Sequence, residues 1–215
     1  MPSSPLSPKL LKGGIVLLDP NTSAVQKIIP LQYNPETVSR TLQPKRLGEG
    51  ASKSDALRIT GPPEEAYKLE IELDATDLLE VKDQQTLEMG IQPMLTILEK
   101  MVYPESSQLI ANNAMASSGS LEIIPTESSL VLFIWSKNRV VPVQLTDLSI
   151  TEEAFDTNLN PIRAKVSLSL KVMTVRELGF DHKGGNLYLA YQKQKEQLAN
   201  KFIPGNLKSL GINSI

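Results

Sequence analysis

The 215-residue sequence contains no cysteine and a single histidine, His182. Without cysteine the chain has no disulfide, no thiolate metal ligand and no cysteine nucleophile, a composition compatible with a reducing compartment. A lone histidine has no second imidazole with which to share a metal ion or relay a proton. His182 stands between Asp181 and Lys183 in a polar stretch beside two glycines. We therefore expect His182 to lie in a solvated loop, and we expect no metal or other cofactor.

Strong net charge and long apolar runs are also missing. Twenty-two basic residues oppose 24 acidic ones, for a formal charge of −2, so no net field favours a nucleic-acid partner. The richest apolar run, Leu130 to Trp135, is far shorter than the ~20 residues that cross a bilayer. Residues 1–11 form a Pro/Ser-rich leader without the apolar core of a signal peptide. We expect a soluble protein that does not insert into membranes.

Catalytic motifs are equally scarce. The glycine pairs Gly13-Gly14 and Gly184-Gly185 lack the residues that complete a phosphate-binding loop, so they are interpreted as turns. Most of the acidic residues alternate with apolar ones, which indicates solvated strand faces. The acidic groups concerned are Glu64-Glu65, Glu70, Glu72, Asp74 and Glu152-Glu153. No catalytic residue is predicted.

What is present is an ordinary globular composition, with 40% hydrophobic and only 5% aromatic residues, which predicts one aliphatic core. In the first half, short β-rich runs predict strands over 15–18, 25–33 and 38–42, the last two flanking a tight corner at Asn34-Pro35. Strict alternation predicts a further strand over Tyr67 to Asp74. Residues 45–56 show no period and predict a surface loop.

One core helix is predicted where the apolar period changes. Apolar residues recur at helical spacing from Leu87 to Val102, and Pro104 ends the pattern. Gly90 and Pro93 interrupt its beginning, so the regular part is expected to start with Pro93 in the first turn. Residues 105–129, rich in Ser, Asn and Ala, are interpreted as an inserted loop in which only 121–124 look ordered.

Two hairpins and a terminal helix are expected in the second half. An apolar strand over 130–135 turns at 136–139 and returns over 140–150, where Pro142 suits an edge or a bulge. A second hairpin over 150–155 and 162–175 turns at 156–161, which includes Asn160-Pro161. Residues 183–186 are expected to break the chain before a helix over Leu187 to Phe202. The apolar stripe of that helix could pack on its own domain or on a neighbouring subunit.

The predicted class is therefore α+β and β-dominated, with about seven antiparallel strands, one core helix and a C-terminal helical extension. We divide the chain into the leader 1–11, a β domain over 12–178 with its insertion at about 105–129, and the helix and tail over 179–215. Trp135, the single tryptophan, ends an apolar strand and is interpreted as a core or interface anchor rather than a ligand platform.

Several short motifs, taken in order, carry a resemblance. Strand 28–38 contains the aromatic-Asn-Pro corner, and a loop with a Gly-Pro pair leads into strand 67–74. The helical segment 90–104, the apolar hairpin 130–143 and the closing hairpin 150–168 follow. The candidate motif or interface residues are Tyr33, Asn34, Pro35, Gly61, Pro62, Trp135, Pro142, Asn160 and Pro161. From Ile28 to Val175 this ordered set resembles the tube-type domain of contractile injection system baseplate proteins, kin to phage tail-tube initiators.

The resemblance implies a tube-protein-like split barrel or sandwich with its helix packed outside. It further implies a non-enzymatic subunit of a homo-hexameric ring that joins the spike to the inner tube and initiates tube assembly. Partners would be the spike, the inner tube protein and other baseplate subunits, within a particle assembled in the cytoplasm of the producing cell. Longer relatives carry a C-terminal LysM module, and residues 178–215 are too short for one. The terminal helix is expected to substitute for it.

Two other functions remain open at this point. The same strand pattern would suit a stand-alone β-sandwich module that binds a small apolar ligand or a peptide. An enzyme that uses paired carboxylates would need an activity that is lost on changing Glu152 or Glu70. If the assembly reading holds, we expect 45–56 and 105–129 to order against neighbouring subunits.

Overall fold

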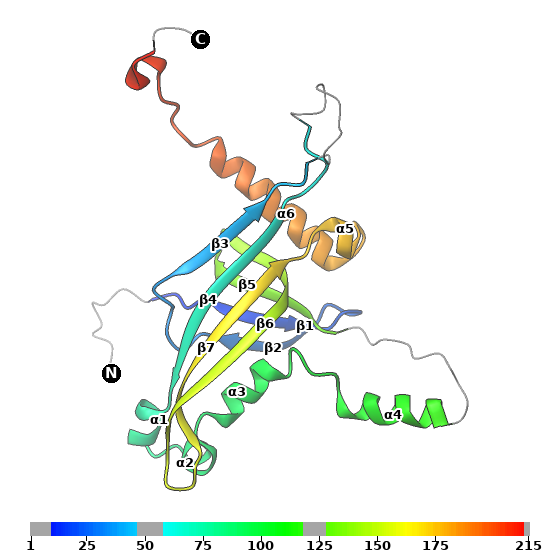
Figure 1. Cartoon of the computed structure of the whole chain (residues 1–215), viewed down its shortest axis with the longest axis vertical. Coiled ribbons are helices and arrows are strands. Elements are labelled where there is room, and N and C mark those ends of the chain that lie inside the picture. The colour runs from blue at the N-terminus through cyan, green and yellow to red at the C-terminus, as the bar shows by residue number, and fades with distance from the viewer. Residues whose placement is uncertain (1–9, 47–57, 118–127, 213–215) are drawn as a thin grey trace.

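The computed structural model describes residues 10–46, 58–117 and 128–212, and the described chain forms one seven-stranded antiparallel sheet with helices around it (Figure 1). The order across the sheet is β2-β1-β5-β6-β7-β4-β3, and the sheet is not closed. The strands are β1 (Gly14–Leu18), β2 (Val25–Pro30), β3 (Val38–Gln43), β4 (Glu64–Asp74), β5 (Leu130–Ser136), β6 (Arg139–Phe155) and β7 (Pro161–Val172). The predicted class, β-dominated α+β, is confirmed.

Alternation gives β4 and β7 one apolar and one polar face. On β4, Tyr67 and Leu69 are buried whereas Lys68 and Glu70 are exposed. Because successive side chains point to opposite faces of a strand, one face of these strands holds the main core. The buried members on these two strands are Tyr67, Leu69, Ile71, Leu73, Ala164, Val166, Leu168, Leu170 and Val172. A second, smaller apolar cluster lies on the other face of β1 and β5, at Val16, Leu18, Leu130 and Leu132.

The corner after β2 joins the two edges of the sheet. Strands β2 and β3 are consecutive in the chain but occupy opposite ends of the strand order, so they flank the predicted corner without pairing. Residues 31–37 can span at most roughly 25 Å when extended, which requires the sheet to curl until its edges approach. Within the corner Leu31 is buried, and Gln32 exchanges hydrogen bonds with the backbone of Asp74 at 2.6 and 2.9 Å.

The single predicted core helix is divided. After α1 (Thr76–Glu80), helices α2 (Gln84–Met89) and α3 (Gln92–Glu99) are separated at Gly90. Gly90 has a φ of +57°, and a Cβ there would lie 2.1 Å from the carbonyl oxygen of Pro161. Pro93 lies in the first turn of α3, as predicted.

The apolar stripe of this region is shorter than predicted. Ile91, Leu95 and Leu98 are buried in the core, which confirms its centre. Leu87 and Val102 are 44% and 49% exposed, so the prediction is wrong at both ends. Leu87 belongs to the separate helix α2 and Val102 lies beyond the end of α3, so only the part of the stripe at Ile91 and along α3 packs on the core.

Residues 106–117 form helix α4 (Ser106–Ser117) where the sequence predicted a loop. No residue of α4 is buried, and Figure 1 shows the helix extending away from the sheet. The loop expectation failed because serine, asparagine and alanine lack an apolar period but do not prevent a helix. The expected order at 121–124, most of the leader and most of loop 45–56 lie outside the described residues.

The two predicted hairpins are present. Strand β6 runs unbroken for 17 residues, pairing with β5 through its first part and with β7 along most of its length. Pro142 therefore lies in an interior strand, not at an edge, and the register shifts fall elsewhere in the ladder. The carbonyl of Pro142 accepts from the N–H of Met173, just past the end of β7. Pro142 therefore faces the end of the β6–β7 ladder, where a missing N–H removes little of the pairing.

After the short helix α5 (Val175–Leu178), helix α6 (Lys183–Ala199) begins four residues earlier than predicted. As expected, His182 lies outside regular structure, in the bend before α6, but it is half-buried rather than fully solvated, and its Nδ1 accepts from the N–H of Gly184 at 3.1 Å as the helix N-cap. The glycine pair is buried in the first turn rather than breaking the chain. Close packing explains why glycine stands in this turn, because a Cβ on Gly185 would lie 1.8 Å from the carbonyl oxygen of Gly179.

We expect Gly185→Ala to lower the free energy of unfolding by about 1–3 kcal/mol, because the added methyl group must displace backbone. The matched control is Gly205→Ala, where the nearest atom to an added Cβ is 3.9 Å away. Urea denaturation of both variants measures the difference. Equal stabilities for the two variants would show that α6 does not pack as described.

Candidate functional site

A buried polar cluster joins α6 to the sheet. Glu65 is only 2% exposed and lies on the core face of β4, in line with Tyr67. Its Oε1 accepts from the hydroxyls of Tyr67 at 2.9 Å and Tyr191 at 2.7 Å, and its Oε2 accepts from Lys195 at 3.2 Å. The two tyrosine hydroxyls lie 2.7 Å apart, and Arg40 of β3 approaches Oε1 at 3.9 Å. We call these five residues the Glu65 cluster.

Electrostatics keep Glu65 ionised. Burial by itself would raise its pKa, but the hydrogen bond from Tyr191, the charge of Lys195 and the hydrogen bond from Tyr67 outweigh it, so the pKa lies below its usual value. Burial and the neighbouring hydroxyl and carboxylate raise the pKa of Tyr191. Because each polar group has a partner, the cluster acts as a clamp that holds α6 against β4.

The other predicted carboxylates are surface groups. Glu70, Glu72 and Glu152 are exposed, as the alternation predicted, whereas Glu65 departs from that prediction. Among the described residues no three His, Cys, Asp or Glu side chains gather as metal ligands. In the same residues no helix is long and apolar enough to cross a membrane.

Both edges of the sheet are unpaired in the described chain. Every residue of β2 and β3 is exposed or half-buried, and each strand has one neighbour only. An edge strand presents a row of free N–H and C=O groups that can pair with another chain. The two edges are therefore the largest sites for backbone pairing in the described structure.

On β4 and β7 the face opposite the main core is polar, whereas on β1 and β5 that face is apolar and is covered by Leu178 of α5 and Leu187 of α6. Lys68, Glu70 and Glu72 on β4 lie opposite Ser169, Ser167 and Lys165 on β7. Ion pairs balance several of its charges, with Arg163 2.8 Å from Asp74 and Lys165 2.9 Å from Glu153. Helix α3, together with Tyr188 and Tyr191 of α6, supplies buried side chains to the main core on the other face. The polar face thus remains available to solvent or to the interior of an assembly.

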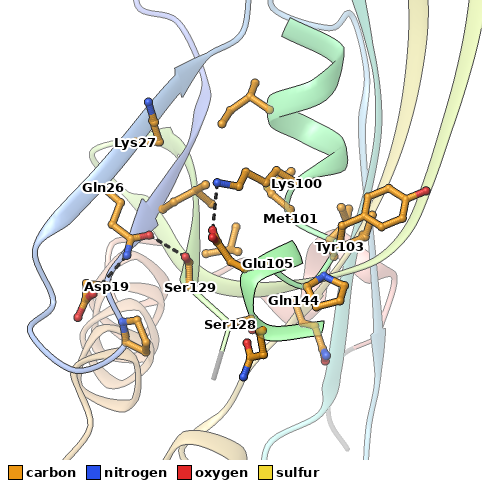
Figure 2. Close-up of a pocket in the computed structure, with 18 of the residues that line it drawn as sticks. Asp19, Gln26, Lys27, Lys100, Met101, Tyr103, Glu105, Ser128, Ser129 and Gln144 are labelled. Atoms are coloured by element: carbon orange, nitrogen blue, oxygen red, sulfur yellow. Dashed lines mark hydrogen bonds and ion pairs between the residues drawn. The ribbon is translucent and has the colours of Figure 1, made fainter. Parts of the chain in front are cut away.

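A surface groove of about 1040 Å³ lies between α3, α4, the β1–β2 turn and strands β5 and β6 (Figure 2). The buried residues at its floor are apolar, among them Leu17, Val131 and Val143. Its polar residues include the Lys100–Glu105 pair, 3.0 Å apart, and Gln26, which bonds both Ser129 and Asp19. The apolar lining residues include Leu17, Ile97, Met101, Val131, Val143 and Leu145. Such a lining suits an apolar segment more than a charged ligand.

The predicted motif residues of the two Asn-Pro corners hold the chain's own backbone. Asn34 accepts from the N–H of Gly13 at 2.9 Å and donates to the carbonyl of Leu11 at 2.8 Å. Asn160 donates to the carbonyl of Glu88 at 3.1 Å, and the carbonyl of Pro161 accepts from Ile91 at 2.9 Å. These contacts give Asn34, Asn160 and Pro161 an intramolecular role.

The other motif residues are scattered. Tyr33 is 45% exposed, and Pro35 and Pro62 are half-buried. A Cβ on Gly61 would meet the guanidinium of Arg176, which donates to the carbonyl of Thr60. The candidates do not form one site, and their value as interface residues stays a prediction.

Trp135 is half-buried. Its ring stacks on Phe133 with centroids 6.1 Å apart and packs against the core. These contacts agree with the predicted anchor.

Sequence reasoning missed the Glu65 cluster and the groove. The alternation of β4 extends backwards from Tyr67 to Glu65 on the same face, and this period was the available signal. Lys195 and Tyr191 stand one helical turn apart on α6, which also predicts a shared face. No local pattern marks the groove, because its walls come from distant segments.

Comparison with known proteins gives one family. The family model described as contractile injection system tube protein matches residues 15–179. That span covers the sheet except for Gly14, the first residue of β1, and ends just after α5, leaving α6 and the tail outside it. No curated protein matched the sequence.

Proposed function

Because the chain belongs to the contractile injection system tube protein family, we propose that it forms a homo-hexameric ring that joins the spike to the inner tube and initiates tube assembly. Membership gives it a structural role in a contractile injection system. The ring, its six copies, the initiator role and the spike, inner tube and other baseplate partners are our proposal. So is assembly in the cytoplasm of the producing cell.

The observation that carries the proposal is the open sheet, in which neither end strand has a second partner among the described residues. A β3-to-β2 contact between copies is head-to-tail, and repeated contacts of this type close into a ring when the rotation per subunit divides the circle. Closure satisfies both rows of free backbone groups. The polar face of β4 and β7, with its hydroxyls and balanced ion pairs, would then line the bore, and α3, which packs on the main core, would lie outside.

The initiator role rests on elements beyond a simple tube ring. Helix α4 has no buried residue, and residues 196–212 are exposed throughout. Both offer apolar side chains for contacts with further layers or copies. A subunit between spike and tube needs such additional contacts.

Deleting the gene and imaging the particles by electron microscopy tests the proposal. Without an initiator we expect spike-containing baseplates with no inner tube, and re-expression of the chain should restore the tube. Native mass spectrometry of the purified protein should give a mass of six copies. Particles with normal tubes in the deletion strain would contradict the initiator role.

The groove in Figure 2 favours one alternative, a stand-alone module that binds an apolar peptide. The oligomeric state of the purified protein distinguishes the ring subunit from the binding module. A chain that remains monomeric at micromolar concentration and does not purify with sheath or spike proteins would support the binding module.

A further inference from the structure

The C-terminal arm, residues 200–212, carries large apolar side chains with no contact to the core. Phe202 is 76% exposed, Ile203 85% and Leu210 72%. Water-exposed apolar groups this close together mark an interaction site on a protein surface. The arm contains lysines but no acidic residue.

The end of the arm is preorganised. Residues Leu207–Leu210 form a 3-10 helix in which Asn206 accepts from the N–H of Lys208 at 2.6 Å. Gly211 ends it with a left-handed conformation at φ +75°. A segment that is already ordered loses less entropy when it binds, so these caps favour docking as a short helix.

The arm leaves the molecule beside the β3 edge. Helix α6, which precedes it, is fixed near its C-terminal half by Lys195 on Glu65, and Glu65 lies opposite Leu42 of β3. The groove lies beside the β2 edge, since Gln26 and Lys27 of β2 line it. Figure 1 shows the arm at one end of the molecule and α3 and α4 at the other.

We propose that the arm of one copy docks into the groove of the neighbouring copy. A β3 edge that meets the β2 edge of the next copy brings the first copy's arm to the side on which the second copy's groove opens. The occupant is therefore a second copy of this chain, and the apolar face of the arm covers the floor at Leu17, Met101 and Leu145. Which copy supplies the arm depends on the proposed ring. That an arm binds a groove of another copy does not depend on it, because this contact is inferred from the exposed arm and the groove themselves.

The absence of cysteine allows a clean cross-linking test. Two single variants, Leu210→Cys in the arm and Val102→Cys in the groove, are mixed and treated with a short bismaleimide. Since each chain carries one thiol, a 210–102 cross-link forms only between copies. The control pairs Leu210→Cys with Leu159→Cys, whose native side chain is 79% exposed and does not line the groove.

We expect the 210–102 product, mapped by mass spectrometry, to exceed the control by about tenfold, because docking raises the effective concentration of the two thiols. Excess peptide of residues 198–212 should reduce it. A 210–102 yield equal to the control overturns the inference, as does preferential cross-linking of the arm thiol to another particle protein. Sizing the same samples separates the proposals: rings without the cross-link refute the arm contact alone, and the cross-link without rings refutes the ring alone.

Discussion

Ile28→Pro is expected to prevent ring formation while leaving the monomer folded. Ile28 lies in edge strand β2 and is 68% exposed. Leu31 donates its N–H to the carbonyl of Gly13 at 2.9 Å, and the β1–β2 register then directs the backbone groups of Ile29 toward β1. By alternation the N–H of Ile28 points away from β1, toward a neighbouring copy.

Proline at this position therefore removes an outward donor without removing a hydrogen bond within the monomer. The lost bond is worth about 1 kcal/mol at each contact between copies, and the pyrrolidine ring obstructs the approach of a partner strand. In a ring, every contact between copies loses the same hydrogen bond and meets the same obstruction. We expect the concentration at half-assembly to rise by at least about tenfold, since roughly 1.4 kcal/mol per contact has that effect.

Ile28→Thr is the matched control, because threonine keeps the N–H, remains β-branched and also shortens the apolar side chain. Sedimentation velocity and electron microscopy measure the ring fraction, and thermal melting checks that both monomers fold. Rings of Ile28→Pro that match those of Ile28→Thr would show that β2 is not the assembly edge.

The sequence was sufficient for the parts of the fold that local pattern determines. Alternation from Tyr67 to Asp74 predicted both the strand and its buried face, because the side-chain period of a strand is two. The hairpins of β5, β6 and β7 followed from apolar runs divided by turn residues. Both signals lie within a few neighbouring residues.

The errors arose where distant segments decide the structure. Gly184-Gly185 begins α6 because a close approach to Gly179 requires small residues there, and that neighbour is set by the tertiary fold. The pairing of β2 and β3 with opposite ends of the sheet likewise depends on curvature that no local motif encodes. The groove combines side chains from several such segments and could not be predicted from spacing. Spacing places Glu65 on the face of Tyr67, and Tyr191 on the face of Lys195, but not the contact between β4 and α6 that forms the Glu65 cluster.

The Glu65 cluster gives the second large prediction. Glu65→Gln leaves the buried hydroxyls of Tyr67 and Tyr191 and the ammonium of Lys195 without their shared carboxylate. We expect the free energy of unfolding to fall by about 1–3 kcal/mol. Tyr191→Phe should cost a similar amount, and the double variant less than the sum, because both changes remove the same hydrogen bond.

The effect of Glu65→Gln depends on pH in a defined direction. The pKa of Glu65 in the folded protein lies below its usual value of 4.5. Its stabilising contribution is therefore complete above the pKa of the unfolded state and is lost as the pH falls through the lower folded value. The difference in stability between wild type and Glu65→Gln should be largest near neutral pH and should shrink below about pH 4.5.

Urea denaturation of both proteins between pH 3 and 7 measures this difference. The other carboxylates with lowered pKa, such as Asp74 and Glu177, are common to both proteins and cancel. Glu70→Gln, on the exposed face of the same strand, is the matched control and should leave stability nearly unchanged. A difference that stays constant down to pH 3 would show that Glu65 does not act as a buried carboxylate, and α6 would then need another anchor to direct the arm.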